Sequence, residues 1–215
     1  AARPEEPAGA GVIVLPDVRG LYRFYEELAL RFAERGHPAV AIDWFGRTAG
    51  VEKRGEDFGY MEHVQQTTAE TTQADVRAAV EQLRERGSEQ VVTVGFCFGG
   101  RVSWLAAASG HGLAGAVGFY GMPGERGGQP GPADRAAEMQ APILGLMGGA
   151  DEHITPPIVQ AFDDALTQAG VEHEIVSYEG APHSFFDRKQ EQFAEASDDA
   201  WRRTLAFIQR VSAPA

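Results

Sequence analysis

The amino-acid sequence predicts an α/β protein whose sheet is mostly parallel and doubly wound, with helices on both faces. Short apolar runs, each long enough for one strand, alternate along the chain with segments whose apolar residues recur at helical spacing. Many of these segments end at a glycine, as elements do where the chain turns. Strands that alternate with helices form βαβ units, which build a parallel sheet covered on both sides. The 215 residues suffice for one such domain.

The first elements follow this alternation. Residues 1–10 are rich in Pro, Ala and Gly and predict a loose N-terminal arm, so we expect one domain over residues 11–215. The continuous apolar run at 11–15 is typical of a strand that is buried on both faces. In order, we expect a strand at 11–15, a turn at 16–20, a helix at 21–35 that ends at Gly36, and a strand at 37–43.

A long loop interrupts the pattern before the middle of the chain. Residues 44–62 have no clear period and contain four glycines, so they predict a loop with at most a helical turn. Regular alternation then resumes. We expect a helix at 66–86, a strand at 91–96, a helix at 99–108 and a strand at 113–120.

The last third begins with an irregular segment at residues 121–140. Its five glycines and three prolines predict an excursion over the surface. Further on, Thr155 followed by Pro156 is typical of a helix start, with Thr as the N-cap. We expect a strand at 142–147, a helix from Thr155 to residue 168, a strand at 173–178, a loop at 179–183 and a helix at 190–211.

The composition narrows the possible partners. A net charge of −12 disfavours binding to nucleic acid or to an anionic membrane surface. No apolar run approaches the ~18 residues of a membrane span. The single cysteine excludes an internal disulfide, so we expect a cytoplasmic protein. The sequence leaves open whether it is a monomer or a small homo-oligomer, and whether Ala1 is a processed terminus.

The stretch around Cys97 carries the strongest functional pattern. The strand predicted at 91–96 contains Gly95 near its end, and Cys97 follows the strand directly. Gly99, Gly100 and a predicted helix come next. This strand–turn–helix arrangement is typical of a nucleophile elbow with cysteine in place of serine, where glycines allow strand and helix to pass closely. A buried, unreactive cysteine remains an alternative. A phosphate loop is disfavoured because no Gly-Lys-Ser/Thr sequence follows.

A nucleophilic thiol needs a base and an orienting acid. His183 follows the last predicted strand, and Asp151 follows the strand before it. The order nucleophile, acid, histidine is that of α/β-hydrolases, so we predict a triad of Cys97, His183 and Asp151. Asp151 could instead cap the following helix. The remaining histidines begin strands, lie in loops or follow a helix (His37, His63, His111, His153 and His173).

With these motifs the chain resembles the dienelactone hydrolases, which are α/β-hydrolases with a Cys-Asp-His triad. The resemblance covers about residues 11–210 and rests on four segments, which are 95–100, 119–121, 147–151 and 179–185. It implies an α/β-hydrolase fold and a hydrolase of carboxylic esters or lactones, similar to carboxymethylenebutenolidase. It also implies a small-molecule substrate, with no metal and no organic cofactor.

The resemblance further implies roles for individual residues. The backbone N–H groups of Phe98 and Val18 would form the oxyanion hole. Asp17 occupies the position of an acidic residue that contacts the resting nucleophile in similar proteins. Arg54 matches one of two arginines that hold a substrate carboxylate, whereas Asp187 stands where the second is expected. An acid at that position disfavours a strictly anionic substrate.

Aromatic residues complete the predicted site. Trp44 and Phe185 could line an apolar pocket, and Tyr120 could form a hydrogen bond near the reacting atoms. We therefore expect the Cys97 thiolate to attack the carbonyl carbon and to form a covalent acyl-enzyme. His183 would act as base and then as acid, and Asp151 would orient the imidazole of His183. The alternative is a thiol-based redox or binding protein on the same scaffold, without turnover.

Overall fold

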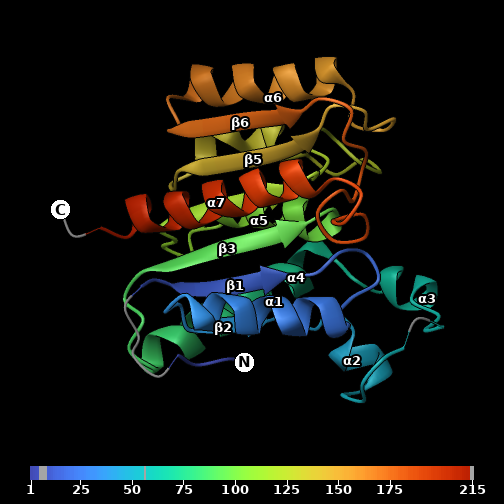
Figure 1. Ribbon diagram of the computed structural model, residues 1–215, viewed down its shortest axis with the longest axis vertical. Helices are drawn as coiled ribbons and strands as arrows, with labels where there is room; N and C mark the ends of the chain where they lie inside the picture. The colour runs from blue at the N-terminus through green and yellow to red at the C-terminus, as the bar shows by residue number, and fades with distance from the viewer. Residues whose placement is uncertain (5–8, 56, 214–215) are drawn as a thin grey trace.

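The structure, a computed structural model, describes residues 1–4, 9–55 and 57–213. Its centre is a six-stranded sheet with the order β2-β1-β3-β4-β5-β6, in which every pairing is parallel (Figure 1). This confirms the predicted α/β fold class. The strands are β1 (Gly11–Leu15), β2 (Ala39–Ala41), β3 (Val91–Phe96), β4 (Gly115–Phe119), β5 (Ile143–Gly148) and β6 (His173–Tyr178).

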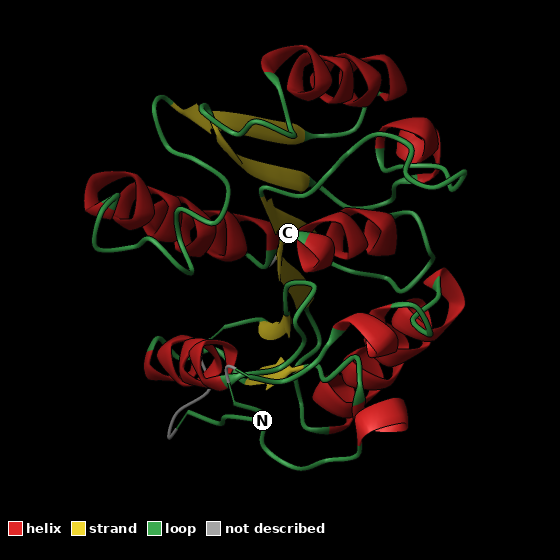
Figure 2. Ribbon diagram, turned by 90° about the vertical axis from the view of Figure 1, so that its right-hand side faces the viewer, coloured by secondary structure: helices red, strands yellow, loops and turns green. Residues whose placement is uncertain are grey.

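Helices cover both faces of the sheet, as the view along the sheet in Figure 2 shows. Buried residues of α1 and α7 pack on one face, and those of α4, α5 and α6 pack on the other. The helices are α1 (Arg23–Glu34), α2 (Gly46–Ala49), α3 (Met61–Val64), α4 (Ala69–Glu85), α5 (Phe98–Ala107), α6 (Pro156–Ala169) and α7 (Ala194–Val211), with the 3₁₀ helix η1 at Ala133–Glu138.

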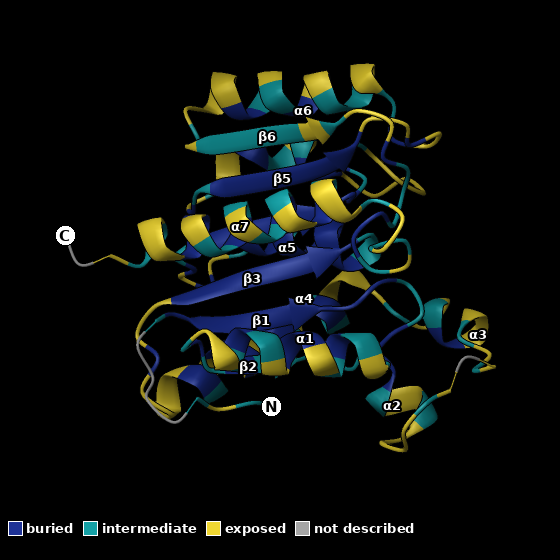
Figure 3. Cartoon of the chain, viewed as in Figure 1, coloured by how far each residue is buried: buried dark blue, intermediate teal, exposed yellow. Residues whose placement is uncertain are grey.

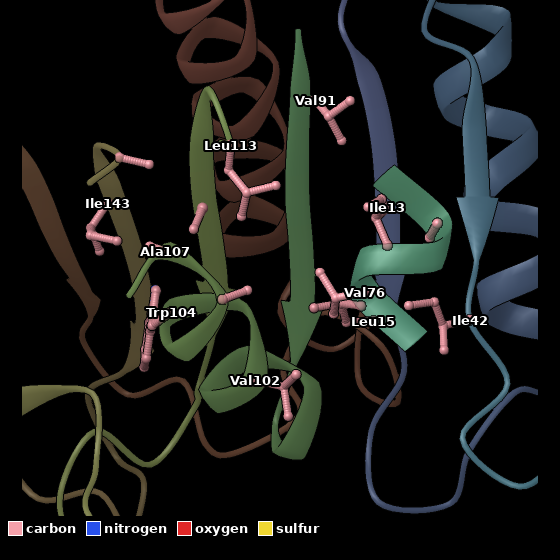
Figure 4. Packing of buried hydrophobic residues seen from close by; sticks show 14 of the residues in the cluster. Ile13, Leu15, Ile42, Val76, Val91, Val102, Trp104, Ala107, Leu113 and Ile143 are labelled. Carbon is pink, nitrogen blue, oxygen red and sulfur yellow. The ribbon is translucent and has the colours of Figure 1, made fainter. Parts of the chain in front are cut away.

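The central strands are buried on both faces, which explains their unbroken apolar sequences. Every residue of β1, β3, β4 and β5 is buried, whereas the edge strand β6 is partly exposed (Figure 3). Side chains that alternate along one strand therefore enter two different cores. In Figure 4, Ile13 and Leu15 of β1 lie in the same core as Val76 of α4 and Val102 of α5.

Some predicted boundaries are wrong by a few residues, for local reasons. The helix expected from residue 66 begins at Ala69, because Thr68 and Thr71 form a capping box there. The strand expected at 37–43 is confined to Ala39–Ala41, since the His37 N–H belongs to the turn after α1 and donates to the carbonyl of Phe32. The last helix begins at Ala194 instead of residue 190, after a run of turns.

The sequence predicts a loose N-terminal arm, but Ala2 of this arm is paired with the first residue of β2. The Ala2 N–H donates to the carbonyl of Ala39, and the Ala39 N–H donates back to Ala2. Residues 5–8 of the predicted arm lie outside the described residues. The loop at 44–62 contains the short helix α2 and the start of α3. Within the described ranges, no helix combines the length and the hydropathy that crossing a bilayer requires.

Candidate active site

Cys97 lies at the carboxyl end of β3 and is the N-cap residue of α5. Its backbone has φ 52° and ψ −111°, a conformation that residues with a Cβ rarely adopt. The Cys97 N–H donates to the carbonyl of Phe119 on the neighbouring strand over 2.9 Å. The strained turn and this hydrogen bond hold a half-buried thiol at the strand end.

The glycines around Cys97 allow three backbone segments to meet. A Cβ atom at Gly95 would lie 2.0 Å from the carbonyl oxygen of Gly99. A Cβ atom at Gly99 would lie 2.1 Å from the carbonyl oxygen of Leu15, at the end of β1. Such distances are far below van der Waals contact, so neither position tolerates a side chain without backbone movement. This is the close approach that the sequence pattern predicts.

Asp151 and His183 are brought together from the ends of β5 and β6. The Nδ1 of His183 lies 2.6 Å from Oδ2 of Asp151. The other carboxylate oxygen, Oδ1, accepts from the N–H groups of His153 at 2.9 Å and Ile154 at 3.1 Å. Asp151 therefore caps the turn before α6 and also binds the imidazole of His183, so the geometry of one carboxylate is compatible with both roles that the sequence left open.

The charges of this pair are set by their surroundings. Burial lowers the pKa of His183, but its hydrogen bonds to Asp151 and Cys97 outweigh burial and raise the pKa to about 10. Burial favours the neutral form of Asp151, yet the hydrogen bonds from His183, His153 and Ile154 lower its pKa. Both pKa shifts favour an imidazolium held against a buried carboxylate.

Cys97 and His183 open into one cleft of about 460 Å³. Tyr120 contributes a wall beside the imidazole, and the two rings lie 5.0 Å apart between centroids. The structure thus brings the predicted nucleophile and the predicted base to one accessible space. The cleft is completed by Phe98, Arg101, Met122, Glu125, Arg126, His153 and Ile154.

The two predicted oxyanion donors lie at an adjoining cavity. Val18 and Phe98 both line a second space of about 550 Å³, and Phe98 also lines the cleft that contains Cys97. Within the described part of the chain, neither the Val18 N–H nor the Phe98 N–H donates a hydrogen bond. These two backbone donors are thus available near the start of α5.

The carboxylate of Asp17 binds other partners than the resting nucleophile that the resemblance implies. Its carboxylate is 2% exposed and accepts from Arg19 Nε at 3.0 Å and from Arg188 Nη2 at 3.2 Å. No hydrogen bond joins Asp17 to Cys97 in the described part of the chain. The shorter aspartate side chain is instead neutralised by arginines from its own loop and from the loop that follows His183. Asp17 is therefore a bridge between loops.

Asp187 also points away from the cleft. It is buried beneath Tyr120, whose hydroxyl donates to Oδ1 over 2.9 Å, and the Tyr25 hydroxyl donates to Oδ2 over 3.3 Å. Burial and the nearby charge of Asp17 raise the pKa of Asp187. The same carboxylate helps to raise the pKa of the buried Tyr120 hydroxyl. Because Asp187 is not a wall of the cleft, it does not argue against an anionic substrate.

Three predicted supporting residues lie outside the cleft. Arg54 Nη2 donates to Asp43 over 2.8 Å, so its guanidinium is held in a different pocket, which Asp43 and Tyr22 also line. Trp44 is buried and donates from Nε1 to the carbonyl of Pro16. Phe185 is fully buried in the core. The prediction that these three residues contact the substrate in this cleft is therefore wrong, since hydrogen bonds or core packing hold each side chain elsewhere.

Arg101 and Arg126 are site residues that sequence reasoning missed. Arg101 is buried, and its guanidinium donates to the carbonyls of Met122, Gly124, Gln129 and Pro130. It therefore fixes the 121–131 loop over the cleft. An arginine at the start of an otherwise apolar helix was the available signal. Arg126 of that loop lines both cavities. The described residues contain no cluster of three or more His, Cys, Asp or Glu side chains arranged to bind a metal.

Comparison with known proteins places this geometry in context. The family model described as the dienelactone hydrolase family matches residues 1–212. A candidate carboxymethylenebutenolidase of Escherichia coli strain K12 is 30% identical over 222 residues, which are 97% of this chain and 80% of that protein. The carboxymethylenebutenolidase of Rhodococcus opacus is 28% identical over 222 residues, with 97% and 84% of the two chains covered.

Solved structures agree with this result. A candidate dienelactone hydrolase from Klebsiella pneumoniae subsp. pneumoniae superimposes with a TM-score of 0.85 at 29% identity, covering 96% of this chain and 90% of that one. A dienelactone hydrolase-like promiscuous phosphotriesterase from metagenomic libraries has a TM-score of 0.77 at 22% identity, covering 99% and 89%. At that identity the second likeness shows the α/β fold alone.

Proposed function

Because the chain belongs to the dienelactone hydrolase family, we propose that its activity as a carboxylic ester hydrolase runs through a thiolate at Cys97. The substrates that we assign are small carboxylic esters and lactones. One observation carries the proposal. His183, oriented by the buried carboxylate of Asp151, opens into the same cleft as a thiol on a strained turn. A binding scaffold without turnover has no use for this combination.

The first half-reaction forms a thioester. With its pKa raised to about 10, His183 holds a proton at neutral pH and can stabilise a thiolate on Cys97 as an ion pair. The thiolate attacks the carbonyl carbon, and the carbonyl electrons move onto oxygen, where the Val18 and Phe98 N–H groups would stabilise the charge. As the tetrahedral intermediate collapses, His183 gives its proton to the departing alkoxide.

The second half-reaction releases the acid. His183 has lost its proton and is now neutral, so it can take a proton from water as the resulting hydroxide attacks the thioester. Collapse of this intermediate breaks the carbon–sulfur bond and restores the thiolate beside the imidazolium. Throughout, Asp151 keeps Nδ1 protonated and directed toward the carboxylate, which leaves Nε2 for the reacting groups.

Turnover of a p-nitrophenyl ester tests this proposal. We expect release of p-nitrophenol by the unaltered protein, with a loss of at least roughly 10³-fold in kcat/KM for Cys97→Ala and for His183→Gln. His153→Gln is the matched control, because His153 lines the same cleft but contacts Asp151 only through its backbone. Its activity should stay within about threefold of the unaltered protein.

A panel of neutral esters, lactones and a dienelactone then ranks the substrates by kcat/KM. Absence of turnover on every member would contradict the hydrolase mechanism and favour a thiol-based redox or binding role. Full activity of Cys97→Ala would contradict the choice of nucleophile while leaving the family assignment intact.

A further inference from the structure

The second cavity, beyond Phe98, adjoins the proposed oxyanion donors, but the reaction described above assigns no part of the substrate to it. It has a volume of about 550 Å³, within the range of ligand pockets in proteins. It lies between α5, the start of α4 and the 121–131 loop. It shares three lining residues with the cleft that contains Cys97, so the two spaces adjoin, and those residues are Phe98, Arg101 and Arg126.

Apolar atoms make up most of the surface of this cavity, although eight of its fifteen lining residues have polar or charged side chains. Val64, Val102 and Leu105 line it together with Val18 and Phe98. Six of these eight side chains already have partners, and within the described part of the chain the Arg126 guanidinium and the Gln129 amide form no hydrogen bond. The Arg101 guanidinium is used by four backbone carbonyls, and Arg135 donates to Glu138 and to the carbonyl of Ala108. An occupant would therefore gain free energy mainly by removing apolar surface from water.

The positions of the catalytic groups decide which part of an ester this cavity receives. His183 must lie beside the leaving alkoxide in order to protonate it, so the alcohol part belongs in the cleft that His183 lines. The second cavity is lined by Val18 and Phe98, whose N–H groups are the proposed oxyanion donors, and not by Cys97 or His183. A substituent that points away from the leaving group, past the oxyanion donors, would reach this space.

We propose that the second cavity is the acyl-binding subsite, and that it selects esters with an unbranched, apolar acyl chain of medium length. This inference rests on the proposed function, because it assigns part of the substrate of the same site. Phe98 stands at the boundary between the two spaces. Its backbone serves the carbonyl oxygen and its side chain borders the route of the acyl chain.

Two ester series test the assignment. In p-nitrophenyl esters from acetate to octanoate, kcat/KM should rise by about three- to fourfold for each added methylene until the cavity is filled. In alkyl acetates from methyl to hexyl, kcat/KM should change much less, because the alcohol part lies elsewhere. A steep rise in the alkyl acetates with a flat acyl series would overturn the assignment. So would a preference for acyl chains that end in a carboxylate.

A cavity-filling variant makes the test local. Leu105 is half-buried on α5 and lines the cavity, so Leu105→Trp should lower the ratio of kcat/KM for the hexanoate to kcat/KM for the acetate at least about tenfold. Leu105→Ala should move the preferred acyl chain to a greater length. Leu30→Trp is the control, because Leu30 is an exposed helical leucine outside this cavity.

These outcomes separate the two proposals. If the unaltered protein hydrolyses no ester at all, the proposed function itself is contradicted. Normal turnover with an unchanged chain-length profile in Leu105→Trp would contradict only the acyl subsite. If Leu105→Trp also loses the acetate activity, Ala69→Trp replaces it, with the adjacent Glu70→Trp as control. Ala69 is exposed and lines the cavity, whereas Glu70 is exposed and does not.

Discussion

Arg188 Nη2 lies 3.2 Å from Asp17 Oδ2, and this contact joins the loop that follows β1 to the loop that carries His183. Asp17 precedes Val18, a proposed oxyanion donor, and Arg188 follows the proposed base by five residues. Arg19 binds the same carboxylate from the first loop. The ion pair therefore connects two parts of the site that are far apart in sequence.

We predict that Arg188→Gln loosens this connection. The arginine side chain is partly exposed, so the loss in unfolding free energy should be small, about 0.5–1 kcal/mol. The kcat/KM for a p-nitrophenyl ester should fall several-fold, because the Val18 N–H and the His183 imidazole would no longer be held in fixed positions relative to each other. Arg188→Lys should recover part of the activity.

The matched control for this variant is Arg202→Gln, which removes a surface ion pair with Asp199, because neither residue lines the cleft. It should leave kcat/KM unchanged. If Arg188→Gln behaves in the same way, the contact between Arg188 and Asp17 has no role in positioning the site.

The raised pKa of His183 predicts a dependence of stability on pH. Its pKa is raised from 6.5 to about 10, so folding favours the protonated imidazole. This stabilisation is present in full below pH 6.5 and is lost as the pH rises through about 10. We expect the difference in unfolding free energy between the unaltered protein and His183→Gln, measured with urea, to shrink steadily across that window.

Cys97→Ala provides a second check on the same group. Cys97 is one of the causes of the raised pKa of His183. In the Cys97→Ala background, replacement of His183 should therefore have a smaller and less pH-dependent effect on the unfolding free energy. A pH-independent difference in both backgrounds would show that His183 titrates as an ordinary histidine.

Gly99 should tolerate no side chain. A methyl group there would lie 2.1 Å from the backbone oxygen of Leu15, and only movement of α5 or β1 could relieve the overlap. We expect Gly99→Ala to lower the unfolding free energy by about 1–3 kcal/mol and to reduce activity further by displacing Cys97. Gly59→Ala is the control, since nothing lies within 4 Å of its added Cβ, and its effect should stay within about 0.5 kcal/mol.

The sequence predicted those features that depend on local pattern. The apolar runs marked strands that are buried on both faces, and the glycines around Cys97 marked the close crossing of β3, α5 and β1. Residues at strand ends could be grouped because parallel strands end at one edge of a sheet. For this reason the sequence alone sufficed to pair His183 with Asp151.

The supporting residues could not be predicted in the same way, because each depends on a distant partner. Arg54 is held by Asp43, and Asp187 is turned inward by Tyr25 and Tyr120. Arg101 does not follow a strand end, yet its guanidinium binds backbone carbonyls of the 121–131 loop and holds this loop over the cleft. Such pairings are set by tertiary packing and leave no periodic signal in the sequence.

The proposed mechanism requires that Cys97 carry the acyl group during turnover. Rapid acid quenching of the protein with p-nitrophenyl butyrate, followed by intact-mass measurement and peptide mapping, tests this requirement directly. Cys97 is the only cysteine in the chain, so no other thiol competes for the label. We expect one butyryl group, bound as a hydroxylamine-sensitive thioester to the peptide that contains Cys97 and absent from protein denatured before mixing. Steady ester turnover with no acyl group on Cys97 at any quench time, together with retained activity of Cys97→Ala, would contradict it.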